Sequence, residues 1–82
     1  MKNLKLEDIC VITDIADCDP WHTAKDSLIG KRIKFDGYLE RPVKYRGYIA
    51  CCVLFFDPIP SLGIWTDRGS CFHCVKLEKI KI

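Results

Sequence analysis

The stretch KRIKFDGYLE, residues 31–40, alternates apolar and polar side chains more regularly than any other part of the chain. Ile33, Phe35 and Leu39 lie on one face together with Gly37, and the charged or polar residues lie on the other. A period of two is typical of a strand with one face in the core and the other in water. A glycine inside such a strand also predicts a bulge or a sharp bend.

Four further segments have the sequence pattern of strands, and they are residues 9–17, 48–56, 62–66 and 71–82. In the first of them, one face is apolar apart from a single threonine. That face consists of Ile9, Val11, Thr13 and Ile15. The second segment is apolar on both faces, which predicts a central strand covered on both sides. In the last segment an apolar set alternates with charged residues. The apolar set is His73, Val75 and Leu77, and the charged residues are Lys76 and Glu78.

The connecting segments carry the residues that interrupt strands. Residues 17–30 predict a long acidic loop, with one turn of helix near residues 23–28, because aspartates and Pro20 punctuate it. Residues 41–47 predict a basic turn. Residues 57–61 contain two prolines, which cannot donate to a sheet ladder, so the strand before them ends there.

These elements predict one all-β domain, residues 1–82, that closes into a small five-stranded barrel with a long first loop. The order of the elements resembles small Src-homology-3-like (SH3-like) barrels, including KOW-type domains. The resemblance rests on the opening strand, on the acidic loop, on LIGK at residues 28–31 and on VKLE at residues 75–78. An OB-fold barrel is the alternative. It usually has a helix before its fourth strand, and residues 57–61 leave no room for one.

The composition is that of a folded domain without a strong charge bias. Hydrophobic residues make up 49% of the 82 residues and charged residues 29%. The net charge of +2 is well below that of a dedicated nucleic-acid binder. The charged start does not resemble a signal peptide, and the longest apolar run, residues 48–56, is far too short for a membrane helix. We therefore expect a cytoplasmic protein that makes no use of a membrane.

Six cysteines are many for a chain of this length. Cys71 and Cys74 have the CxxC spacing at which two thiolates can hold one zinc ion. Cys18 and His22, in the first loop, would complete a four-ligand site and fasten that loop to the last strand. Zinc is the one cofactor that the sequence suggests, and the alternative is that these four residues are ordinary loop and strand residues.

The other cysteines suggest packing. Cys51 and Cys52 are adjacent, so in a strand they point to opposite faces and cannot readily share an ion. Together with Cys10 they are expected to be buried thiols that act as small hydrophobic residues. A redox role for the CxxC motif would require a helix N-terminus, which lowers a thiol pKa, and this motif begins a strand.

Basic and aromatic residues interleave around the turn at residues 41–48 and continue onto the outer face of the strand before it. With the first loop they form the expected binding surface, which consists of Trp21, His22, Arg32, Lys34, Tyr38, Arg41, Lys44, Tyr45, Arg46 and Tyr48. Cations meet phosphates and rings stack on bases, but Asp36 and Glu40 interrupt a pure phosphate track. A solvated hairpin is the alternative reading of the same charges.

Asp14, Asp17 and Asp19 cluster after the first strand. They lack the glycine and the distal glutamate of a calcium loop, so turns in which each aspartate bonds its own backbone explain them better. The sequence contains no Ser-His-Asp pattern, no paired glutamates and no glycine-rich phosphate loop. It therefore predicts a non-enzymatic binding module whose partner is a protein or an anionic nucleotide or nucleic acid, with a protein favoured by the low charge. A zinc-stabilised interaction module is the first alternative, and a CxxC thiol–disulfide oxidoreductase is the second.

Overall fold

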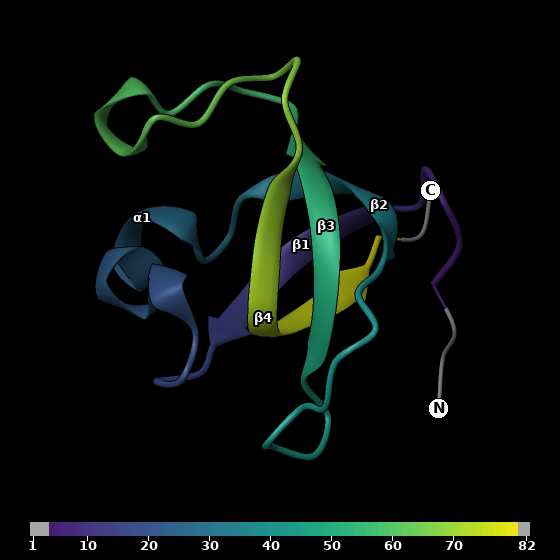
Figure 1. The fold of residues 1–82 in the computed structure, drawn as a ribbon. Coiled ribbons are helices and arrows are strands. Elements are labelled where there is room, and N and C mark those ends of the chain that lie inside the picture. Colours follow the sequence, from purple (N-terminus) through teal and green to yellow (C-terminus); the bar gives the residue numbers. More distant parts are fainter. Residues whose placement is uncertain (1–3, 81–82) are drawn as a thin grey trace.

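The computed structural model describes residues 4–80 and shows four antiparallel strands in a closed ring. The strands are β1 (Ile9–Ile15), β2 (Arg32–Tyr38), β3 (Ile49–Phe55) and β4 (Ser70–Lys79). Each strand pairs with the next, and β4 pairs back onto β1, so that the sheet has no free edge. The all-β prediction is confirmed at this level (Figure 1).

The first loop, residues 16–31, contains most of the helical structure. A 3₁₀ helix, η1 (Pro20–Ala24), leads directly into the short helix α1 (Lys25–Leu28). Asp19 caps η1, and Pro20 occupies the first helical position, where its missing N–H is not needed. Helical structure therefore begins three residues earlier than predicted, and it ends with Leu28 fully buried in the core.

The strand predicted at residues 62–66 is wrong, and the barrel has four strands instead of five. Pro60 opens a one-turn 3₁₀ helix, η2 (Pro60–Leu62), and Gly63 follows it in the left-handed region. Ile59 and Ile64 then exchange both backbone hydrogen bonds across this turn. Their peptide groups are satisfied locally and not in the sheet. Residues 57–69 therefore form an arm that projects from the barrel between β3 and β4 (Figure 1).

The apolar face expected for β1, which consists of Ile9, Val11, Thr13 and Ile15, does not face the core along its whole length. The pairing of β1 with β4 shifts between Ile12 and Asp14, which marks a bulge. Before the shift Cys10 and Ile12 are fully buried, and after it Ile15 is buried, whereas Ile9 and Val11 are only half-buried. One extra residue in the strand exchanges the two faces, and the sequence pattern alone did not reveal it.

The alternation predicted for residues 31–40 is confirmed as far as Phe35, but β2 ends at Tyr38, and Leu39, which was expected on the inner face, lies beyond it and is only half-buried. Ile33 and Phe35 are buried in the core, and the polar residues between them are exposed or half-buried. The bulge expected at Gly37 is also present, because the β2–β3 register shifts between Phe35 and Tyr38. Gly37 has φ +110°, a conformation that side chains other than glycine rarely adopt.

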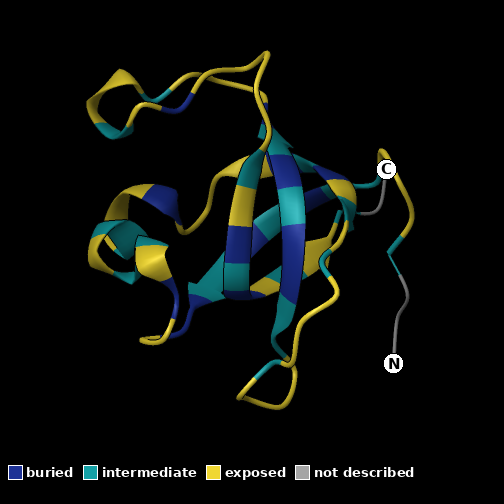
Figure 2. Cartoon of the chain, viewed as in Figure 1, coloured by how far each residue is buried: buried dark blue, intermediate teal, exposed yellow. Residues whose placement is uncertain are grey.

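In the last two strands, buried residues lie among half-buried and exposed ones (Figure 2). β3 lies between β2 and β4 as expected, but only its inner face is fully covered, because a closed ring has an inside and an outside. β4 ends at Lys79, and its buried residues are Phe72, Cys74 and Val75. His73 and Leu77, which were expected on the inner face with Val75, are half-buried. The predicted end of this strand at residues 81–82 lies outside the described residues.

Candidate functional site

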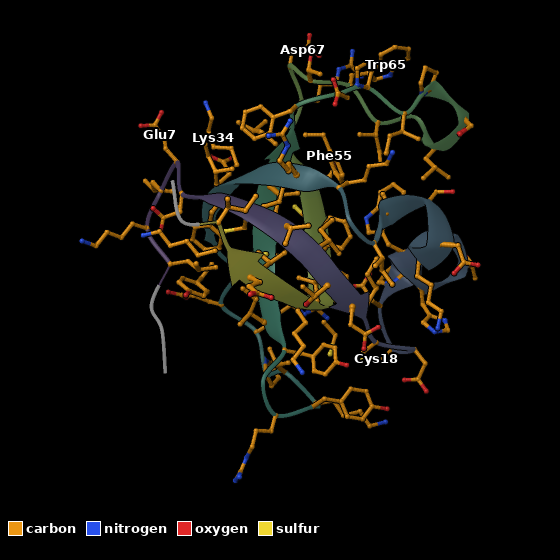
Figure 3. The ribbon with its side chains drawn as sticks, turned by 180° about the vertical axis from the view of Figure 1, so that it is seen from behind. Glu7, Cys18, Lys34, Phe55, Trp65 and Asp67 are labelled. Carbon is orange, nitrogen blue, oxygen red and sulfur yellow. The ribbon has the colours of Figure 1, made fainter. Side chains whose placement is uncertain are left out.

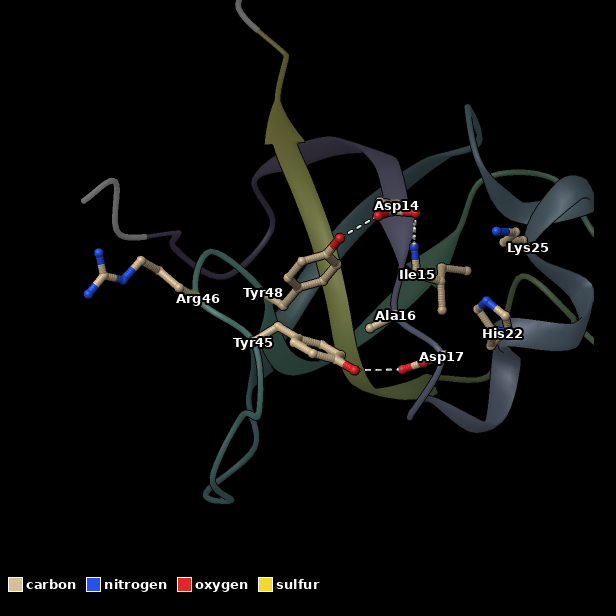
Figure 4. A pocket seen from close by; sticks show the side chains of 9 residues that line it. All are labelled: Asp14, Ile15, Ala16, Asp17, His22, Lys25, Tyr45, Arg46 and Tyr48. Carbon is tan, nitrogen blue, oxygen red and sulfur yellow. Dashed lines mark hydrogen bonds between the residues drawn. The ribbon is translucent and has the colours of Figure 1, made fainter.

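A groove of about 490 Å³ separates the first loop from the turn at residues 45–48. We call it the tyrosine groove. Tyr45 and Tyr48 form one wall, and His22 and Lys25 form the other (Figure 4). The end of β1, with Ile15 and Ala16 and the carboxylates of Asp14 and Asp17, lies between the walls. The structure thus brings together the first loop and the basic-aromatic turn that the sequence suggested as one surface.

Two hydrogen bonds hold the tyrosine wall in place. The Tyr48 hydroxyl donates to Asp14, and the Tyr45 hydroxyl donates to Asp17 over 2.9 Å. These pairs are 34 and 28 residues apart in the sequence. The two rings meet edge to face with centroids 5.9 Å apart, and Lys76 places its ammonium 5.5 Å from the Tyr48 ring centroid. The polar ends of both tyrosines are engaged, so the wall is fixed in position.

The local backbone explains why both tyrosine side chains reach the end of β1. The Tyr48 N–H donates to the Tyr45 carbonyl over 3.3 Å and closes a tight turn. Gly47, inside that turn, has φ +87°, a conformation suited to glycine. The buried side chain of Ile15 anchors the opposite strand. The turn therefore places both hydroxyls within hydrogen-bonding distance of Asp14 in β1 and Asp17 just after it.

A buried carboxylate fixes the other wall. Asp19 is only 4% exposed, and its Oδ1 accepts a hydrogen bond of 2.8 Å from the Trp21 N–H. Its Oδ2 accepts from the N–H groups of His73 and Cys74, at 2.7 and 2.8 Å. One side chain therefore shapes the start of η1 and docks it onto β4. The local bond to Trp21 agrees with the turn role expected for these aspartates, and the long-range bonds to β4 had no signal in the sequence.

Trp21 belongs to this docking and does not line the groove. Its indole N–H donates to the Cys71 carbonyl over 3.0 Å. Its ring packs against Phe72 with centroids 5.9 Å apart. The tryptophan therefore caps the core and holds η1 against β4, while the neighbouring His22 lines the groove.

The remaining residues of the expected binding surface lie elsewhere. Arg32, Lys34 and Tyr38 belong to β2, and Lys34 lines a separate hollow of about 220 Å³ beside Phe55. Figure 3 shows Lys34 and Phe55 at the end of the barrel opposite Cys18. Arg41 and Lys44 are exposed between β2 and β3 and do not line the groove. Of the ten predicted residues, the groove unites only four, and these are His22, Tyr45, Arg46 and Tyr48.

The four predicted zinc ligands are not brought together. Cys71 is exposed and Cys74 is buried. Cys71 contacts Cys52, whereas Cys74 contacts Cys18. Among residues 4–80 no group of three or more histidine, cysteine, aspartate or glutamate side chains is arranged to hold a metal ion. The two cysteines of the CxxC motif therefore contact different thiols and do not converge on one point.

Burial raises the pKa of three of the thiols. Cys10 and Cys51 are fully buried, as expected for small hydrophobic residues, whereas Cys52, for which burial was also expected, is only half-buried. Loss of solvation is the main cause that raises the pKa of Cys51, to about 12, and that of Cys10 above its ordinary value. Burial, together with the neighbouring Cys18 thiol, raises the pKa of Cys74 to about 11. These three thiols therefore stay protonated at neutral pH.

The tyrosine wall changes the acidity of its own groups. The hydrogen bond from Tyr48 is the main cause that lowers the pKa of Asp14 below its ordinary value of 3.8. The same bond raises the pKa of Tyr48, and the bond to Asp17 raises the pKa of Tyr45. Both bonds therefore favour neutral phenols, and the bond from Tyr48 favours an ionised Asp14.

Tyr48→Phe keeps the ring and removes this bond, so the pKa of Asp14 should rise toward its ordinary value. A carboxylate with a lowered pKa stabilises the folded state above its unfolded pKa, and this stabilisation is lost as the pH falls through the folded pKa. The free energies of unfolding of wild type and variant should therefore differ at neutral pH and converge only as the pH falls below the folded pKa of Asp14. Carboxyl NMR titration and urea unfolding measure the two effects. Tyr45→Phe, which affects Asp17, should leave the Asp14 titration unchanged, and an unchanged titration in Tyr48→Phe would contradict the assignment.

Comparison with known proteins gives no relative to guide the reading of this site. No family model, no curated protein and no solved structure matches the chain. The helices found within residues 4–80 are too short to cross a membrane. The chemistry of the tyrosine groove is therefore the basis for proposing a function.

Proposed function

We propose that this protein is a non-enzymatic binding module that holds a segment of a partner protein in the tyrosine groove. The observation that carries the proposal is the pair of Asp–Tyr hydrogen bonds, which fix a hollow of about 490 Å³ between two distant parts of the chain. A preformed site loses little conformational entropy when it is filled, and this favours binding.

The distribution of charge favours a protein over a polyanion. Asp14 and Asp17 accept hydrogen bonds from the tyrosine hydroxyls, while Lys25 lies on the opposite wall of the groove. Figure 4 shows Arg46 extending away from His22 and Lys25, so the cations do not converge on one point. A phosphate chain would meet two carboxylates, whereas a peptide can match both charge signs and pack against the rings.

A random peptide library displayed on phage tests this proposal. Peptides selected on the wild-type protein should bind His22→Ala and Tyr45→Ala at least about tenfold more weakly, which corresponds to about 1.4 kcal/mol. Arg32→Ala and Lys44→Ala are matched controls, because both residues are exposed and lie outside the groove. They should leave the affinity unchanged. Selected peptides that bind all four variants equally would place binding on another surface.

Labelled single-stranded and double-stranded oligonucleotides test the other partner class. Under the present proposal they should bind weakly or not at all at physiological salt. Tight binding that weakens steeply as salt rises, and that weakens in Arg32→Ala as much as in His22→Ala, would replace the peptide partner with a phosphate chain spread over the barrel.

Two broader assignments accompany this proposal. The meander of four strands and the long first loop support an SH3-like barrel over an OB-fold, because the helix lies between β1 and β2 and the β3–β4 connection contains only η2. The cytoplasmic location stays a prediction from the sequence.

A further inference from the structure

Two thiols on the outside of the barrel face one another across β3 and β4. Cys52 and Cys71 are direct partners in the strand register. Their sulfur atoms lie 2.8 Å apart, which is closer than the usual approach of two unbonded sulfurs. Cys71 is exposed and Cys52 is half-buried, so solvent reaches the pair.

We propose that Cys52 and Cys71 are a site of reversible oxidation, at which a hydroperoxide converts the two thiols into a cross-strand disulfide. The proposal concerns the outer face of β3 and β4 and does not depend on what the tyrosine groove binds.

The reaction proceeds in two displacement steps. The Cys71 thiolate attacks one oxygen of the hydroperoxide, the O–O bond breaks, and the leaving oxygen takes up a proton and departs as water or an alcohol. Cys71 is then a sulfenic acid. The Cys52 sulfur attacks it, the S–S bond forms, the S–O bond breaks, and the hydroxyl leaves with the Cys52 proton as water. Two thiols lose two electrons, and one hydroperoxide gains them.

The surroundings of the pair determine which thiol reacts first. Burial is the main cause that raises the pKa of Cys52, to about 11, and the hydrogen bond with Cys71 adds to it. The exposed Cys71 is therefore the thiol that meets the oxidant, and Cys52 resolves the sulfenic acid. Because the two are already in contact, the second step requires little movement of the backbone.

The other cysteines are less suited to this reaction. Cys10 and Cys51 are fully buried, so an oxidant in solvent does not reach them. Cys18 is exposed, but the thiol beside it, Cys74, is only 1% exposed. Cys52 and Cys71 therefore combine an accessible thiol with a partner that also borders solvent.

Oxidation would join the strands where the first loop docks. The Cys71 carbonyl accepts the indole N–H of Trp21, and Asp19 binds the amides of His73 and Cys74 just beyond it. A disulfide between residues 52 and 71 would also close the projecting arm into a covalent loop. Such a crosslink restricts the unfolded chain, so the oxidised protein should have a Tm several degrees above that of the reduced protein.

The test treats the purified, fully reduced chain with an equimolar amount of hydrogen peroxide. We expect the loss of two of the six thiols, a mass decrease of two hydrogen atoms, and a crosslink between the tryptic peptides 47–68 and 69–76 that dithiothreitol reverses. Fragmentation of the linked peptides should place the bond on Cys52 and Cys71. Cys52→Ser and Cys71→Ser should form no such crosslink and show no rise in Tm on oxidation.

Cys18→Ser is the matched control, since it removes an exposed thiol of the first loop and leaves Cys52 and Cys71 unchanged. It should form the crosslink as fast as the wild type. Six thiols still free after treatment, a crosslink that persists in Cys71→Ser, or one that disappears in Cys18→Ser would each overturn the proposal. A crosslink that maps to Cys51 or Cys74 would overturn it as well.

Discussion

Asp19→Ala should lower the free energy of unfolding by about 3–5 kcal/mol. The carboxylate is almost fully buried and accepts three backbone hydrogen bonds, from Trp21, His73 and Cys74. Alanine leaves three amide groups without this acceptor, and each unsatisfied buried donor costs about 1–3 kcal/mol, reduced where water can enter. Urea unfolding at neutral pH measures the loss.

Asp17→Ala is the matched control in the same loop. Asp17 is exposed and makes one hydrogen bond, to Tyr45, so its loss should cost less than about 1 kcal/mol. Amide hydrogen exchange gives a second readout, because in Asp19→Ala the amides of His73 and Cys74 should lose protection. Equal destabilisation by the two alanine variants would show that Asp19 does not hold the first loop.

Phe72→Ala should cost about 3–5 kcal/mol. Phe72 is fully buried in β4, with Trp21 on one side and Phe55 on the other. Its removal leaves a cavity that a closed barrel of four strands cannot easily fill by collapse. Thermal and urea unfolding measure the change. Phe72→Leu, which keeps most of the volume, should cost markedly less.

Phe56→Ala provides the surface comparison. Phe56 follows β3 directly, but 43% of it is exposed. The same substitution there should change the free energy of unfolding by less than about 1 kcal/mol. If the two alanine variants were equally destabilised, the core would not depend on Phe72 as described.

Local alternation predicted the strands well where the backbone is regular. It failed where a bulge or a local turn interrupts the regular backbone of a strand. In β1 an extra residue near Thr13 exchanged the two faces, and in the arm a turn beginning at Pro60 replaced a strand. Both changes depend on backbone hydrogen bonds, to β4 in one case and between Ile59 and Ile64 in the other. No side-chain pattern encodes such bonds.

From the sequence, the candidate site was predictable only as one surface formed by the first loop and the basic-aromatic turn. Aromatic residues in the turn and a histidine in the first loop marked the right parts of the chain. The bonds from Tyr48 to Asp14 and from Tyr45 to Asp17 join residues too far apart in sequence for spacing to reveal them. The CxxC motif misled because its two thiols contact different cysteines, Cys52 and Cys18, which the spacing does not reveal.

The closure of the ring by β1 and β4 has a consequence for synthesis of the protein. Of the four strands, β1 leaves the ribosome first, and the edge that pairs with β4 stays unpaired until β4 has been made. Until then β1 exposes unpaired peptide groups and apolar side chains to other growing chains. A nascent chain halted before Ser70 should therefore stay sensitive to protease, and resistance should arise only once β4 has emerged.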